Sequence, residues 1–261
     1  MKKMKTSHSP FRRWPALCLL PLLALAVLGV FLARHLPAQD AAKDKPSADA
    51  PKDTTKPAPA GGDLVPLNIK LPAPAFKGTP KDIQLSSYVE PLSDKPRPAM
   101  MVPAGLKNVA PGKKLTSSDK NATTDILEKI TDGDKEASDQ SIIFLRKGTQ
   151  YVQMDLGGPH EVFAILIWHA HNAAKVYHDV IVQAADDPDF LQNVRTVFNN
   201  DQDNSSGLGV GTDREYFETH EGRLINAKGV KARYLRFYSK GSTESALNEY
   251  TEIEVYGRPA Q

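Results

Sequence analysis

Histidine and aromatic residues gather in two short stretches, Trp168-His169-Ala170-His171 and Tyr177-His178. Residues two apart on a strand face the same side, so His169 and His171 are expected to point together, and a short connection returns His178 nearby. Convergent imidazoles suit zinc or copper, whereas imidazoles beside aromatic faces suit a sugar. No carboxylate completes a metal set at ligand spacing, and a core role is the plain alternative. We predict ligand contact by Trp168, His169, His171, Tyr177 and His178.

Patterns of known catalytic sites are missing from the sequence. It contains no Gly-x-Ser-x-Gly elbow, no HExxH pair and no phosphate-binding P-loop, and its one cysteine, Cys18, lies in the apolar N-terminal segment. Asp186, Asp187 and Asp189 place carboxylates together around Pro188, and we treat this stretch as a turn with no acid/base role. We therefore predict that the protein is not an enzyme. A metal-dependent enzyme built on the histidine cluster is the least favoured alternative.

Charge and composition limit the classes of partner. The chain has 261 residues, of which 40% are hydrophobic and 25% are charged, which is ordinary for a globular protein. Its 33 basic residues nearly balance 31 acidic ones, giving a net charge of +2. Because nucleic-acid binding relies on an excess of positive charge, we expect no nucleic-acid partner.

The first 38 residues have the pattern of an export segment. Basic residues between Lys2 and Arg13 precede an uncharged, mostly apolar run from Trp14 to Ala33. Such a run can be cleaved as a signal peptide, for which Leu36-Pro37-Ala38 is a candidate site, or can remain as a membrane anchor. We expect an exported protein at the cell surface or in the periplasm. It is either tethered by residues 14–33, its only membrane contact, or secreted after cleavage.

Proline divides the rest of the chain into regions of different character. Residues 39–63 consist mainly of Ala, Lys, Asp, Pro, Thr and Gly, which predicts a disordered linker. Apolar residues return in residues 64–104, where Leu67, Ile69, Leu71, residues 83–85 and residues 100–102 favour short extended strands packed on the main domain. This scarcity of proline after Gly105 favours a packed domain over residues 105–258. The prolines that follow Gly105 are Pro111, Pro159, Pro188 and Pro259.

Short apolar runs separated by turn residues fill this domain. Helical periodicity is nearly absent, and about eight segments have strand character. They predict an all-β, antiparallel jelly-roll sandwich. The expected strands cover residues 151–156, 161–168, 177–184, 194–198, 233–238 and 252–256, with weaker ones at 216–219 and 223–225.

Several landmarks in this domain resemble one known family. In order, they are Asn108-Val109-Ala110, Gly112-Lys113, Thr116-Ser117-Ser118, Ile130-Thr131-Asp132-Gly133-Asp134, Val152-Gln153-Met154-Asp155-Leu156-Gly157, Val230-Lys231-Ala232-Arg233-Tyr234-Leu235-Arg236 and Glu252-Ile253-Glu254-Val255-Tyr256-Gly257. The order resembles the discoidin family, also called coagulation factor 5/8 type C, among the galactose-binding-like jelly rolls. The chain departs from it after the Asp-Gly loop, where Glu136, Ala137 and Ser138 replace the usual Thr and Trp, and lacks the terminal cysteine pair of animal members.

The resemblance implies a structural calcium ion held by Asp132, Asp134 and Glu252. Calcium binds six to eight oxygen ligands in a flexible cage, and a glycine between two carboxylates permits a sharp turn. A solvated Asp-Gly-Asp turn without metal is the alternative, because Ala137 stands where a threonine oxygen often contributes.

Two functions remain compatible with the sequence. The first is an exported recognition module that binds a glycan or another cell-surface ligand through loops at one end of the sandwich. The second is an interaction or assembly module that docks an envelope protein. Because fold does not determine function, the sequence does not name the ligand.

Overall fold

The fold is described by a computed structural model that places residues 63–76, 86–93 and 95–261. The expected export segment, nearly all of the linker and the strand expected at 83–85 lie outside these residues. Within the part described, no helix is long and apolar enough to span a bilayer.

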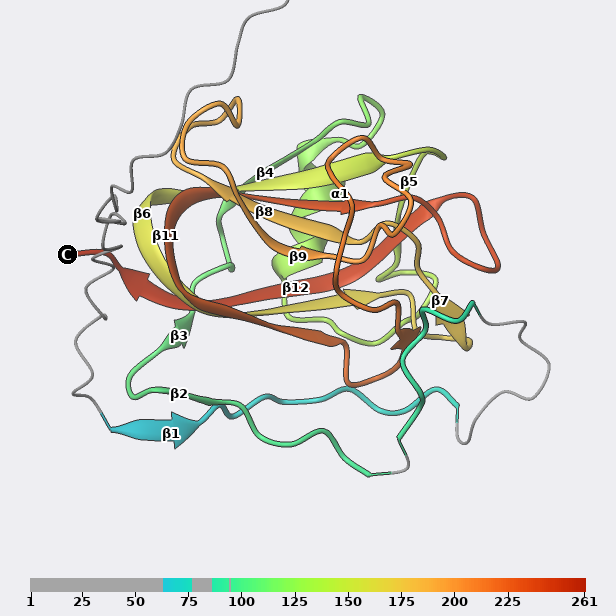
Figure 1. The fold of residues 1–261 in the computed structure, drawn as a ribbon, viewed down its shortest axis with the longest axis horizontal. Helices are drawn as coiled ribbons and strands as arrows, with labels where there is room; N and C mark the ends of the chain where they lie inside the picture. Colours follow the sequence, from blue (N-terminus) through green and yellow to red (C-terminus); the bar gives the residue numbers. More distant parts are fainter. Residues whose placement is uncertain (1–62, 77–85, 94) are drawn as a thin grey trace, which may run out of the picture. The chain divides into compact units, whose positions relative to one another are not determined.

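Two antiparallel layers form the body of the protein (Figure 1). The strands β6 (Gln150–His169) and β11 (Arg223–Ser239) pair along nearly their whole lengths. Each of them bends, so that one half lies in the first layer and the other half in the second. The first layer adds β4 (Lys114–Ser117), β8 (Ile181–Ala185) and β9 (Arg195–Asn199). The second adds β3 (Lys107–Asn108), β5 (Ile143–Leu145) and β12 (Asn248–Pro259). The predicted all-β antiparallel jelly-roll sandwich is confirmed.

Two bent strands stand where the sequence predicted four separate ones. Gly157 and Gly229 have φ values of +81° and +74°, and the register of the β6–β11 pair shifts near both. Glycine adopts this conformation without steric strain, and a bulge bends a strand while pairing resumes beyond it. The expected ends at Gly157-Gly158-Pro159 and at residue 225 were therefore wrong, because each strand continues from one layer into the other.

Several short elements differ from expectation as well. The strand expected at 177–184 starts only at Ile181, because Asp179 has a φ of +50° and interrupts the extended backbone. The elements not predicted from the sequence include β1 (Leu64–Pro66), β3, β4, β5, β7 (Lys175–Val176) and a short helical segment, α1 (Thr124–Leu127) with η1 (Glu128–Thr131), that precedes the Asp132 loop. The strands β7 and β10 (Phe217–Glu218) form a small antiparallel pair that belongs to neither layer.

Side chains that point between the layers form the core. On the second half of β6, Ile165 and Ile167 belong to this core. Strand alternation turns Leu166 and Trp168 to the opposite face, yet both are also fully buried. A further layer must therefore cover the outer side of this sheet.

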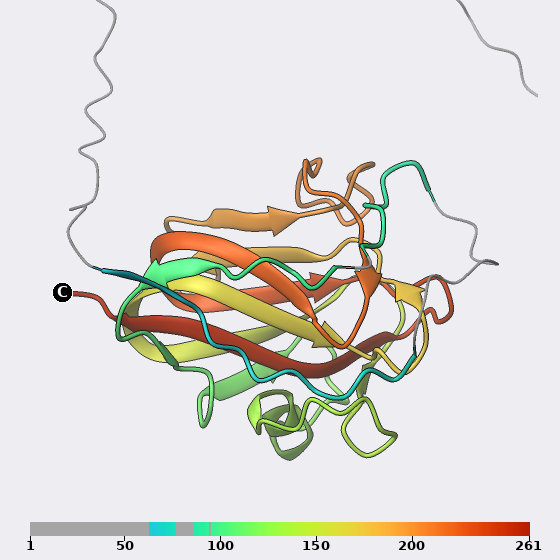
Figure 2. The ribbon, with the colours of Figure 1, turned by 90° about the horizontal axis from the view of Figure 1, so that it is seen from below.

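That layer is the N-terminal strap, by which we mean the described residues between 63 and 104. It starts and ends in a small antiparallel pair, β1 (Leu64–Pro66) with β2 (Met101–Pro103). Its two limbs run across the sheet that contains β12, β6 and β11 (Figure 2). Hydrogen bonds fix it there: Lys135 Nζ donates to the carbonyl of Lys70 at 2.9 Å, and Arg214 Nη2 to that of Val89 at 2.9 Å.

Candidate ligand-binding site

The structure corrects the predicted role of Trp168. Its ring is 0% exposed, and its Nε1 donates a hydrogen bond to the carbonyl of His220 at 2.9 Å. Lys135 Nζ lies 4.9 Å from the ring centroid, and Gly222 packs directly against the ring. A sugar cannot stack on a face that the protein already covers. Trp168 is a packed core residue, covered by Lys135 and by the turn that contains His220 and Gly222.

His169, His171 and Tyr177 are likewise buried and cannot contact a ligand directly. The rings of His169 and Tyr177 stack with centroids 4.3 Å apart, and His169 Nδ1 lies 3.1 Å from a carboxylate oxygen of Glu218. His171 Nε2 lies 2.8 Å from the carbonyl of Lys135. Each histidine has one hydrogen-bond partner inside the fold, while His169 Nε2 and His171 Nδ1 are buried without one. Their burial fits the core role that the sequence left as an alternative.

Tyr177 belongs to a buried charged group. Its hydroxyl donates to Glu249 Oε2 at 2.7 Å, and the same oxygen accepts from Lys175 Nζ at 2.8 Å. Burial, together with the neighbouring carboxylate of Glu249, raises the pKa of Tyr177 far above its usual range. The hydroxyl therefore stays protonated and serves as a fixed donor.

The three imidazoles do not converge on a metal. Over the described ranges, no histidine belongs to a group of three ligand-type side chains close enough to share an ion. His169, His171 and His178 therefore do not form the convergent set that the sequence suggested. His178 points elsewhere, and it is the one member of the predicted set with an accessible side chain, 41% exposed.

His178 lines an open hollow of about 380 Å³. Its Nδ1 lies 3.1 Å from Glu215 Oε1, and this hydrogen bond raises the pKa of His178 above its ordinary value and lowers that of Glu215. Glu215 Oε2 in turn accepts from Ser86 Oγ of the strap at 2.5 Å. The lining comes from the strap and from four loops: Ser86, Tyr88, His178, Asp179, Asn200, Gln202, Asp203, Ser205, Glu215 and Lys240.

Asp179 anchors one wall of the His178 hollow in a strained conformation. Its φ of +50° is unusual for a residue other than glycine, and such strain persists only where the surroundings enforce it. Here Asp179 Oδ2 accepts from the hydroxyls of Ser205 at 2.7 Å and Ser206 at 2.8 Å, and Lys240 Nζ lies 3.5 Å away. The loop after β9 is thereby tied to the turn after His178.

A buried amide in the same hollow has a donor to spare. Asn200 is 2% exposed, and its side-chain oxygen accepts from the backbone N–H of Val180 at 2.7 Å. Its Nδ2 has no hydrogen-bond partner. An unpaired buried donor is costly, and an acceptor oxygen brought by a ligand would satisfy it.

Asp179, Asp201 and Asp203 place carboxylate oxygens within 4.8 Å of one another. Asp201 accepts from the backbone N–H groups of Ser205 and Ser206 at 3.0 and 2.9 Å, and Asp203 also accepts from Ser205 at 3.0 Å. Because the oxygens already accept protein donors, the group acts as a scaffold for the loop. From the sequence, Asp201-Gln202-Asp203-Asn204 indicates only a polar loop.

The predicted calcium residues come together in part. The backbone N–H of Gly133 donates to Glu252 Oε2 at 3.3 Å, so the Asp-Gly loop meets the C-terminal strand. Glu252 is fully buried and its Oε1 lacks a partner, and burial raises the pKa of this carboxyl to about 9. Asp132 and Asp134 are exposed, and Asp132 Oδ1 accepts from the N–H of Asp134 at 2.8 Å. Among the described residues, however, the ligand atoms of Asp132, Asp134 and Glu252 do not form a group that lies within 4.8 Å of one another, so the loop and the strand meet without a preassembled cation cage.

Most residues of the His178 hollow were not predicted from the sequence. Tyr88 and Ser86 lie in the Pro-rich segment, and no local sequence pattern predicts where that segment packs. Asn200 and Lys240 follow strands as ordinary loop residues. The one available signal was the density of Asn, Asp and Ser between residues 199 and 206. Such residues favour tight side-chain-to-backbone loops, which can present further polar groups to a ligand.

No family model and no curated protein matches the chain. Similar solved structures include a family 89 glycoside hydrolase from Clostridium perfringens, at 18% identity and a TM-score of 0.41, covering 59% of this chain. The chain spans 15% of that enzyme's length. The CBM32 module of AlyQ in complex with 4,5-unsaturated mannuronic acid matches at 20% identity and a TM-score of 0.38, covering 54% of this chain and 92% of the module. A chitosan-binding module of a Paenibacillus sp. IK-5 chitosanase/glucanase matches at 19% and 0.40, covering 57% and 98%.

Proposed function

We propose that this protein is a non-catalytic recognition module that binds a neutral sugar unit in the His178 hollow. One observation carries the proposal: the hollow unites an aromatic face with hydrogen-bonding side chains of both kinds in a volume of about 380 Å³. Sites of this size, with a few well-placed polar groups, are typical of small-ligand binding.

Tyr88 and the polar wall provide complementary contacts. The Tyr88 side chain is 53% exposed, so it offers an aromatic face to the C–H groups of a sugar ring. Asp203 Oδ2, which does not accept from Ser205, is an acceptor for a hydroxyl group, whereas Lys240 and Asn200 Nδ2 are donors. Carboxylates outnumber ammonium groups in the lining, which disfavours an anionic sugar and favours a neutral one.

Calcium is the second part of the proposal. Glu252, with a carboxylate oxygen of Asp132 or Asp134, would hold the ion beside the Asp-Gly loop. A bound calcium ion would supply charge compensation for the buried carboxylate and would tie the loop to β12. Its role is therefore structural.

The location of the module is also a proposal. The basic and apolar pattern of residues 2–33 favours export, with the domain either tethered to the membrane or released. A glycan at the cell surface or in the surroundings of the cell would then be within reach of the module.

The test is a glycan-array and calorimetric screen of the full-length chain. Tyr88→Ala should lower affinity for the sugar about tenfold, which is about 1.4 kcal/mol. Phe144→Ala is the matched control, since Phe144 is 52% exposed but lies outside the hollow, and it should leave affinity unchanged. Equal affinity of the wild type and the Tyr88 variant for every bound glycan would refute the site. Co-purification of one stoichiometric protein by a chain that binds no glycan would favour the envelope-assembly alternative.

A further inference from the structure

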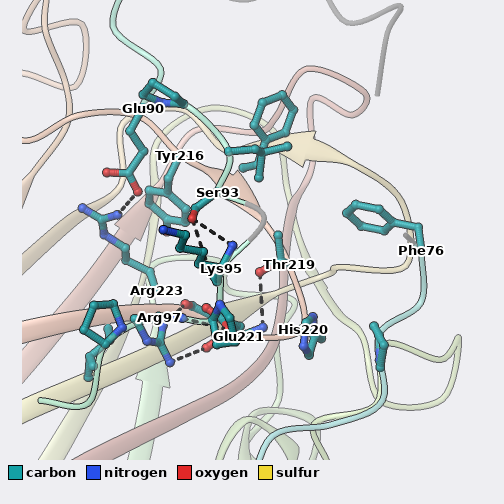
Figure 3. Close-up of a pocket in the computed structure, with 18 of the residues that line it drawn as sticks. Phe76, Glu90, Ser93, Lys95, Arg97, Tyr216, Thr219, His220, Glu221 and Arg223 are labelled. Atoms are coloured by element: carbon teal, nitrogen blue, oxygen red, sulfur yellow. Dashed lines mark hydrogen bonds and ion pairs between the residues drawn. The ribbon is translucent and has the colours of Figure 1, made fainter. Parts of the chain in front are cut away.

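A second and larger hollow, of about 790 Å³, lies between the strap and the turn that leads into β11 (Figure 3). The sandwich contributes Tyr216, Phe217 and residues 219–224. The strap contributes residues 74–76, 90–93 and 95–98. We call this space the strap hollow.

Specific polar contacts hold the strap above this hollow. Arg97 Nη1 donates to the carbonyl of Gly222 at 2.7 Å, and its Nη2 donates to that of Glu221 at 3.0 Å. Farther along, Arg223 pairs with Glu90 (Figure 3). The backbone N–H of Glu90 also donates to the carbonyl of Glu215 at 2.8 Å. The strap hollow is therefore a built feature with fixed walls.

The same contact separates the two hollows. Val89 bridges to Glu215. In the second limb of the strap, Ser86 and Tyr88 precede this bridge and line the His178 hollow, whereas residues 90–93 and 95–98 follow it and line the strap hollow. On the sandwich side, Glu215 lines the His178 hollow and the next residue, Tyr216, lines the strap hollow. The two hollows are neighbours with different linings.

Donors and positive charge are in surplus in the strap hollow. Lys95, Arg97 and Arg223 face two carboxylates, Glu90 and Glu221. Glu90 is engaged by Arg223, and Glu221 Oε1 accepts from the backbone N–H of Arg97 at 3.3 Å. Two buried donors in the lining have no partner, namely Arg223 Nε and the hydroxyl of Tyr216. Guanidinium and ammonium groups bind carboxylates strongly, so this lining suits a carboxylate-bearing ligand.

The rest of the lining favours a sugar ring over a peptide. Proline has no backbone N–H, so this part of the strap offers few donors to an added peptide strand. The proline rings and Leu92 instead present C–H groups, and Phe76 presents an aromatic face. Both kinds of surface suit the apolar side of a pyranose. The prolines of the lining are Pro74, Pro91, Pro96 and Pro98.

We propose that the strap hollow is a second binding site, for a uronic-acid unit of an acidic polysaccharide. The sugar carboxylate would lie against the Lys95, Arg97 and Arg223 side, with the ring against the proline-rich side. The inference goes beyond the neutral-sugar site and does not depend on it.

The test is calorimetric titration of the full-length chain with two trisaccharides. Trigalacturonate should bind about tenfold tighter than its carboxyl-reduced, neutral counterpart. Lys95→Glu should remove that preference, and the milder Lys95→Gln should reduce it. Lys120→Glu is the control for overall charge, because Lys120 is exposed and lies outside the hollow, and it should keep the preference. Equal melting temperatures of the variants show that each folds.

Four results would overturn the proposal. They are equal binding of the charged and reduced trisaccharides, equal loss in the Lys95 and Lys120 variants, loss of trigalacturonate binding in His178→Ala, and triglutamate binding as tight as trigalacturonate. The second result means a non-specific charge effect, and the third means that the uronate occupies the His178 hollow. The fourth means an acidic-peptide site. Retained uronate binding in His178→Ala supports a separate site even if the neutral-sugar site fails.

Discussion

Replacing Gly222 with alanine tests whether Trp168 is a packed core residue. Gly222 has a φ of +62°, and a Cβ atom at this position would lie 2.7 Å from Cε2 and Nε1 of the Trp168 ring. Neither atom belongs to a flexible side-chain end, because the ring is fully buried and its Nε1 is bonded to His220. The substitution must therefore displace the ring or the turn.

Two terms set the expected loss of stability. The left-handed backbone conformation costs an alanine about 1 kcal/mol. Overpacking a well-packed site costs roughly 1–3 kcal/mol more. The free energy of unfolding should thus fall by about 3 kcal/mol in total, which for a domain of this size lowers the melting temperature by about 10 °C.

Gly112 provides the matched control. Its φ is +70°, and a Cβ there would meet nothing within 4 Å. Gly112→Ala should cost only the backbone term of about 1 kcal/mol, or about 3 °C. Thermal unfolding followed by circular dichroism measures both variants, and a red-shifted tryptophan emission in Gly222→Ala reports the displaced ring. Equal losses in the two variants would refute the packing of Trp168 against Gly222.

Three further predictions concern the sites. Calcium at a hundredfold excess over Kd should stabilise the fold by about 2.7 kcal/mol and so raise the melting temperature. Asp132→Ala or Glu252→Gln should remove this gain. Equal melting temperatures in calcium and in chelator would contradict the prediction. Sugar affinity should fall as pH rises above the raised pKa of His178, because the protonated ring that Glu215 stabilises can donate from Nε2. The His178–Glu215 pair should likewise stabilise the fold fully below about pH 6.5, and this stabilisation should be lost as pH rises through the raised pKa. Glu215→Gln should move the binding midpoint to lower pH, and an unmoved midpoint rejects the pairing. Tyr177→Phe should cost about 1–2 kcal/mol in urea unfolding and leave sugar affinity unchanged, whereas lost affinity at full stability would return Tyr177 to ligand contact.

The fold class was predictable because its signals are local. Alternation along β6 and β12, turn residues between strands and the scarcity of proline after residue 105 all act within a few positions. The bends were not predictable from the same signals. Gly157-Gly158-Pro159 has the composition of a strand end, and only the partner strand β11, which bends at Gly229, keeps β6 paired through it.

The site was predicted less well, because a local pattern does not distinguish the rim of a sandwich from its core. His169 and His171 do lie at the end of a strand, where ligand loops are expected. Both are buried against distant residues, His169 against Glu218 and His171 against Lys135, and no spacing in the sequence encodes these contacts. The calcium prediction remains untested: Glu252 meets the Asp-Gly loop only through the backbone N–H of Gly133.

The strap explains both the failed and the newly found sites. Through Arg97 it holds the turn at Glu221 and Gly222, and this turn covers the Trp168 ring that was predicted as a stacking platform. In the same course it carries Tyr88 to the loops around His178 and Lys95 to the turn before β11. Residues 105–261 alone would lack an aromatic wall in one hollow and most of the positive charge in the other. The proposed recognition therefore requires the segment that lies outside the family resemblance, and its specificity is set largely by that segment.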